Sequence, residues 1–72
     1  MSTELRTLTG TGTVVVYTDE NKVARQLREM PSCYRMVPYE QEQKGKIALV
    51  GWDFYFPRSK MRALLNLGCQ KT

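Results

Sequence analysis

The chain has 72 residues and contains no histidine, one tryptophan and two cysteines, Cys33 and Cys69. Histidine is the commonest general base and metal ligand, so its absence argues against acid–base catalysis and against most metal sites. Two cysteines alone do not complete a zinc site, and no serine lies in a nucleophile-elbow motif. We therefore expect a protein that is not an enzyme and that binds neither a metal nor a cofactor.

Long hydrophobic runs are also missing. No stretch approaches the roughly 18 apolar residues that a membrane span requires, and no apolar segment follows Met1 as it would in a signal peptide. We expect a cytoplasmic protein without membrane association, in which thiols stay reduced. Whether Cys33 and Cys69 pair is left open, because the sequence does not give their separation in space.

The composition, with 42% hydrophobic and 25% charged residues, is typical of a folded domain. A chain of this length forms one domain and buries only about 60% of its unfolded surface, so its core is small. A dimer or a bound partner would add stability. We expect a single domain over residues 1–72, with residues 1–4 and 69–72 frayed.

The most apolar segment is Lys46–Pro57, which holds the tryptophan and both phenylalanines. Its β-branched and aromatic residues predict a strand, along which side chains alternate between two faces. The face expected to meet the helices is apolar and consists of Ala48, Val50, Trp52, Phe54 and Phe56. The other face is mixed and consists of Ile47, Leu49, Gly51, Asp53 and Tyr55. We expect Asp53 to pair with Arg35 across a hairpin.

The remaining elements follow from periodicity and turn residues. Strands are predicted at Leu5–Thr9, at the valine-rich Thr13–Thr18 and at Ser32–Tyr39. Helices are predicted at Asp19–Met30, which Pro31 ends, and at Arg58–Leu67. The order (β)βαββα predicts a small α+β domain. Its three- to four-stranded sheet would be mainly antiparallel, with both helices packed on one face.

The polar segment Glu40–Lys46 joins the last two predicted strands. It contains Gly45 and is typical of a hairpin loop. Loops of this kind are the most mobile parts of a domain, and we expect the same here.

The net charge of +4 is unevenly distributed along the chain. Residues 1–43 carry five basic and six acidic residues, a net charge of −1, whereas residues 44–72 carry six basic and one acidic residue, a net charge of +5. A basic half favours an anionic partner. The alternative is a solvated surface with no ligand.

The second predicted helix begins with cations, although a helix N-terminus disfavours each exposed cation by about 0.3–1 kcal/mol. An anion there would meet unpaired backbone N–H groups as well as the cations. We therefore predict a phosphate or nucleic-acid site at this terminus. Its candidate residues are Arg58, Ser59, Lys60 and Arg62, extended by Lys44, Lys46 and Tyr55.

Two functional hypotheses remain. The first is a small binding module that engages nucleic acid or another polyanion through its basic C-terminal half. The alternative is a protein–protein interaction module, either a homodimer or a small inhibitor of a larger enzyme of the kind that phages encode. Its working surface would be an edge strand or a sheet face decorated by the four tyrosines, because tyrosine and arginine are enriched at protein interfaces.

Overall fold

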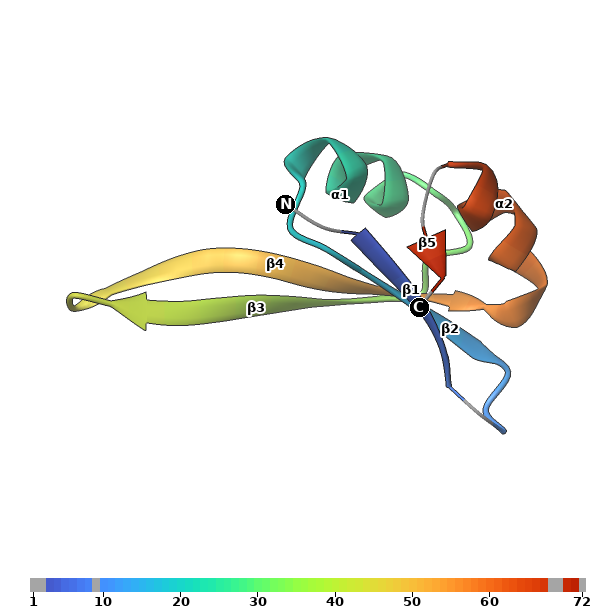
Figure 1. Ribbon diagram of the computed structural model, residues 1–72, viewed down its shortest axis with the longest axis horizontal. Helices are drawn as coiled ribbons and strands as arrows, with labels where there is room; N and C mark the ends of the chain where they lie inside the picture. Colours follow the sequence, from blue (N-terminus) through green and yellow to red (C-terminus); the bar gives the residue numbers. More distant parts are fainter. Residues whose placement is uncertain (1–2, 9, 68–69, 72) are drawn as a thin grey trace.

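The computed structural model describes residues 3–8, 10–67 and 70–71. They form one sheet with two helices on one side (Figure 1). Along the sheet the strands follow the order β3-β4-β2-β1-β5. In chain order the elements are β1 (Thr3–Leu8), β2 (Thr13–Thr18), α1 (Asn21–Arg28), β3 (Arg35–Gln43), β4 (Lys46–Pro57), the 3₁₀-helix η1 (Arg58–Lys60), α2 (Met61–Asn66) and β5 (Gln70–Lys71).

The predicted fold class is confirmed. Four antiparallel strands and two helices follow in the order ββαββα, and the two-residue β5 adds a parallel pairing to β1. Two expectations about the ends need correction. Thr3 and Glu4 were expected to fray but pair with Thr18 and Tyr17 of β2. Residues 70–71 were also expected to fray but form β5, because β1 offers them an edge. Residues 1, 2, 69 and 72 lie outside the described ranges.

The core lies between the sheet and the helices. Side chains from alternate positions of β1, β2 and β4 meet one face of each helix. The fully packed set is Leu5, Val14, Val16, Ala24, Leu27, Phe54, Phe56 and Leu64. The face of β4 that carries Phe54 and Phe56 therefore meets the helices, as predicted. None of the helices in the described ranges is long and apolar enough to cross a membrane.

Both helices are shorter than the sequence predicts. α1 begins at Asn21 rather than Asp19, because the Glu20 N–H is held by the Thr18 hydroxyl oxygen at 3.1 Å and keeps the chain extended before the helix. The segment after Pro57 starts with the 3₁₀ turn η1, and α2 proper covers only Met61–Asn66.

The connection between β3 and β4 is much shorter than the predicted loop Glu40–Lys46. Strand pairing continues to Gln43 and Lys46, which leaves only Lys44 and Gly45 in the turn. Both have positive φ, 51° and 77°. This conformation is that of a type I′ turn, whose twist matches that of the flanking strands. The polar residues before the turn are therefore strand residues.

A β-bulge at Val50 changes which residues share a face. Tyr39 pairs with Gly51, whereas Glu40 pairs with Leu49, so Val50 is an extra residue in β4. Paired residues project to the same side of a sheet. Beyond the bulge, Leu49 and Ile47 therefore lie on the side of the sheet that carries the helices, and Ala48 lies on the opposite side. The predicted faces of β4 are wrong for Ala48, Leu49 and Ile47, because the prediction assumed unbroken alternation.

The distal part of the β3–β4 hairpin, residues 40–50, projects from the rest of the domain (Figure 1). We call it the arm. β2 pairs with β4 only over Trp52–Pro57, so in the arm β4 has β3 as its single neighbour. The molecule measures 41 × 25 × 23 Å, and its radius of gyration is 12.6 Å. A compact chain of this length would have about 11 Å, and the excess reflects the arm.

Candidate interaction surfaces

Four of the predicted anion-binding residues lie together at the end of the molecule opposite the arm tip. Arg58, Ser59 and Lys60 form η1, Arg62 follows in the first turn of α2, and all four are exposed. No acidic side chain in the described ranges forms an ion pair with these cations. This cluster, together with Leu65 in α2 and Leu67 at the end of α2, is called the basic end below.

The predicted anion site assumed the N-terminus of an α-helix with unpaired backbone N–H groups, and the structure differs from this in two respects. The first turn is 3₁₀ rather than α-helical, and α2 has six residues. The Arg58 N–H, expected to be unpaired, donates to the Gly12 carbonyl oxygen at 2.9 Å. What remains is a cluster of exposed cations rather than the open N-terminus of a long helix.

The other three predicted residues are elsewhere. Lys44 and Lys46 are at the tip of the arm, and the hairpin does not fold back toward the helices (Figure 1). A strand rises about 3.3 Å per residue, so the 12-residue β4 separates Lys46 from the basic end by roughly 36 Å. Tyr55 lies on the sheet face away from the helices, paired with Val15 and Arg35.

That second sheet face, which we call the open face, has no helix over it in the described part of the chain. Long side chains cover it instead, and Val15 beneath them is 2% exposed. Tyr17 and Tyr39 are in contact with ring centroids 5.9 Å apart, and Tyr34 and Tyr55 are 6.3 Å apart. The guanidinium of Arg35 lies over the Tyr55 ring, 5.4 Å from its centroid. The four tyrosines therefore lie opposite the helices, as predicted.

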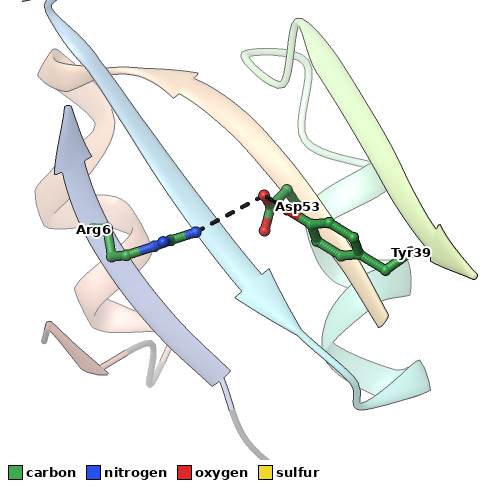
Figure 2. A network of polar contacts seen from close by, with 3 residues as sticks. All are labelled: Arg6, Tyr39 and Asp53. Carbon is green, nitrogen blue, oxygen red and sulfur yellow. Dashed lines mark hydrogen bonds and ion pairs between the residues drawn. The ribbon is translucent and has the colours of Figure 1, made fainter. Parts of the chain in front are cut away.

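Asp53 is the buried acid of the open face, at 3% exposure. The Tyr39 hydroxyl donates to its Oδ2, and Nη2 of Arg6 lies 3.9 Å from the same oxygen. Figure 2 shows Arg6 reaching across β2 toward the carboxylate, with Tyr39 on the other side. The predicted pairing of Asp53 with Arg35 is wrong, because Arg35 is paired with Tyr55 and stacks on its ring.

The contacts within this cluster shift the pKa of one of its members. The hydrogen bond to Asp53 raises the pKa of Tyr39 above its ordinary value of 10.0, with burial and the charge of Asp53 adding to the effect. Oδ1 of Asp53 has no hydrogen-bond partner among the described residues. Arg6 was not identified from the sequence, because its proximity to Asp53 depends on β2 lying between β1 and β4.

The arm exposes large apolar side chains on its helix side. Ile47 is 71% exposed and Leu49 is 51% exposed. They pair with Glu42 and Glu40 of β3, so this side of the arm is apolar and acidic. The other side is polar, and a hollow there at the tip is lined by Gln43, Lys44, Lys46 and Ala48.

Known proteins offer no guide. No protein-family model matches the chain, and no curated protein or solved structure is significantly similar to it. The function therefore has to be argued from these surfaces.

Cys33 lies outside them. Its thiol is free and half-buried, and donates weakly to the Arg35 carbonyl oxygen at 3.4 Å. Cys69 lies outside the described residues.

Proposed function

We propose that this protein is a non-enzymatic protein–protein interaction module whose working surface is the arm. The observation that carries the proposal is the exposure of Ile47 and Leu49 side by side on a two-stranded projection. Fully burying an isoleucine or leucine side chain is worth about 1.5–3 kcal/mol. Leaving both in water on an extended arm forgoes that stabilisation, which a partner would supply.

The shape of the arm supports the same proposal. A two-stranded hairpin without a packed face is marginally stable in water. None of the described core residues lies in the arm. The open face carries the tyrosines and arginines that are enriched at protein interfaces. It is on the opposite side of the sheet from Ile47 and Leu49, so it is a separate surface from the apolar side of the arm.

Edge-strand addition is a weaker route. β3 is one of the two edge strands of the sheet, and Pro38 in its middle has no N–H to donate to an added strand. We therefore assign the binding to side chains of the arm rather than to backbone pairing along the whole of β3.

Site-specific photocrosslinking tests the proposal. A benzophenone amino acid placed at position 47 or 49 should give protein adducts in the native host, identified by mass spectrometry. The matched control is position 4, where Glu4 is exposed on β1 and projects to the open face. Adducts at 47 and 49 but not at 4 would support the arm as the working surface. Equal labelling at all three positions, or none, would contradict it.

Polyanion binding is a second candidate, and the exposed cations of the basic end, which form no ion pair with any described residue, favour it. Its contacts would be Arg58, Ser59, Lys60 and Arg62, without the arm lysines. The binding constant for a labelled oligonucleotide, measured by anisotropy, should then fall with salt, and its logarithm should have a slope near −0.7 per neutralised phosphate against the logarithm of the salt concentration for a single strand. Arg58→Glu/Lys60→Glu should abolish binding, while Lys22→Glu/Arg25→Glu on α1, with the same change in net charge, should weaken it less. Equal losses would indicate nonspecific attraction.

A further inference from the structure

We infer that the partner of the arm is a second copy of this chain, bound so that the arm of each copy lies on the basic end of the other. The inference rests on the proposed function, because it names the occupant of the same surface. Its basis is the match between two surfaces that the structure leaves uncovered.

The two surfaces are complementary in charge and in polarity. The helix side of the arm presents Ile47 and Leu49 with Glu42 and Glu40 directly across from them. The basic end presents the exposed cations Arg58, Lys60 and Arg62. The apolar part of that end consists of Leu65 and Leu67, which are 42% and 45% exposed.

On α2, a basic and an apolar side chain lie next to each other on the helix surface. Arg62 and Leu65 are three residues apart, so they are neighbours on the helix surface. On the arm, each glutamate and its apolar partner are opposite one another on adjacent strands, with Cβ atoms about 5 Å apart. Each surface therefore places charged side chains beside apolar ones, Glu40 and Glu42 beside Leu49 and Ile47 on the arm and Arg62 beside Leu65 on α2.

The shape of the molecule allows both contacts at once. The arm and α2 lie at opposite ends of the long axis (Figure 1), and both surfaces are on the helix side of the sheet. A two-fold axis that lies on the helix side of the sheet, parallel to it and perpendicular to the long axis, turns the helix sides toward each other. It brings each arm toward the other copy's basic end, with α1 of each copy, which stands between the arm and α2, between the two contacts (Figure 1). The interface is then isologous and closed, as in most homodimers.

Other pairings of the same surfaces are less favourable. Two arms placed face to face would bring Glu40 and Glu42 of one copy against the same residues of the other, and like charges across an interface repel. The arm does not reach its own basic end, because the strand β4 itself separates them. The apolar contacts supply affinity, whereas the charges select this pairing over the others.

Charge reversal with complementation tests the inference. The arm variant Glu40→Lys/Glu42→Lys and the end variant Arg58→Glu/Arg62→Glu each create two repulsive contacts in their own homodimers. We expect each to self-associate at least about ten-fold more weakly than the wild type in sedimentation equilibrium. In an equimolar mixture, one contact is native and the other is reversed on both sides, so a heterodimer of wild-type affinity should form.

The control keeps the chemistry and changes the side of the arm. Gln41 and Gln43 project to the open face of the same strand, so Gln41→Lys/Gln43→Lys adds two lysines away from the interface and should leave self-association unchanged. Circular dichroism and Trp52 fluorescence report folding of each variant, and recovery of association in the mixture shows independently that both variants are folded.

Either of two results would overturn the inference. One is a wild-type protein that stays monomeric at the highest attainable concentration. The other is a dimer that neither charge reversal weakens. If the purified protein is monomeric while position 47 crosslinks to a different protein in cells, the second-copy inference fails and the proposed function stands. If the protein neither self-associates nor gives crosslinks from position 47, the second-copy inference and the proposed function both fail.

Discussion

Tyr39, on the edge strand β3, donates its hydroxyl hydrogen to Oδ2 of the buried Asp53 on β4. The only charged partner of this carboxylate in the described structure is Arg6, at 3.9 Å. A hydrogen bond to a buried charge matters mainly when it is removed, because the charge is left underpaired. Tyr39 therefore holds the base of the arm to the sheet.

Tyr39→Phe should lower the free energy of unfolding by about 1–3 kcal/mol, the usual cost of leaving a buried acceptor without its donor. Urea unfolding followed by Trp52 fluorescence measures this. The matched control is Tyr34→Phe, which removes the exposed hydrogen bond to Thr13 and should cost less than about 1 kcal/mol. Equal losses from both substitutions would show that Asp53 does not depend on Tyr39.

Alkaline pH should weaken the fold through the same contact. Because the pKa of Tyr39 is raised above 10.0 in the native state, the unfolded chain loses this proton first as the pH rises. The stability that the Tyr39–Asp53 hydrogen bond contributes is therefore fully present below the pKa of Tyr39 in the unfolded chain. It is lost as the pH rises through the pKa of Tyr39 in the native state. Urea midpoints measured from neutral pH to above pH 10 should fall more for the wild type than for Tyr39→Phe. If the urea midpoints of the wild type and of Tyr39→Phe fall equally with pH, the Tyr39–Asp53 hydrogen bond is not the cause of the alkaline destabilisation.

Gly51→Ala should destabilise the protein even though the φ of Gly51 is not positive. A Cβ at this position would lie 2.7 Å from the Tyr17 hydroxyl oxygen and 2.9 Å from two ring carbons. Overpacking of this kind costs about 1–3 kcal/mol. In a Tyr17→Thr background the clash is absent, so Gly51→Ala should be neutral or stabilising there. A double-mutant cycle by urea unfolding measures the coupling.

Lys44→Asn should stabilise the arm. Lys44 has a φ of 51°, in the left-handed region that asparagine adopts more readily than lysine. The gain should be up to about 1 kcal/mol, and it should appear locally, because the arm is set apart from the core. Amide hydrogen exchange of Gln43 and Lys46 should slow in Lys44→Asn and accelerate in Lys44→Val. No change in either variant would mean that the turn does not limit opening of the arm.

Much of the fold follows from the sequence. The residue types of Thr13–Thr18 and Lys46–Pro57 allow little except strands, and Pro57 marks the end of β4 correctly. α1 ends at Arg28, before the Met30 that the sequence predicts from Pro31. The type and order of the elements were therefore predictable. The bulge was not, because an extra residue such as Val50 has no signature in an apolar run that alternation already fits.

The arm was predictable in part. A helix rises 1.5 Å per residue and a strand more than twice as much, so the predicted helix Asp19–Met30 would span about 17 Å while the predicted strand Lys46–Pro57 would span about 36 Å. That comparison indicates that part of β4 extends past the helices. The pairing of Arg6 with Asp53 was not predictable, because it requires the order of strands across the sheet.

The bulge at Val50 makes the arm more sensitive to chain length than to residue type. Ile47 and Leu49 lie on the helix side because the bulge interrupts the alternation that begins at Gly51. A single residue inserted between Leu49 and Val50, with the bulge kept at Val50, would pair with Glu40 in place of Leu49 and turn both side chains to the opposite side of the hairpin. Conservative substitutions at 47 and 49 preserve the surface, whereas an insertion that leaves the bulge in place exchanges its apolar side for its polar one.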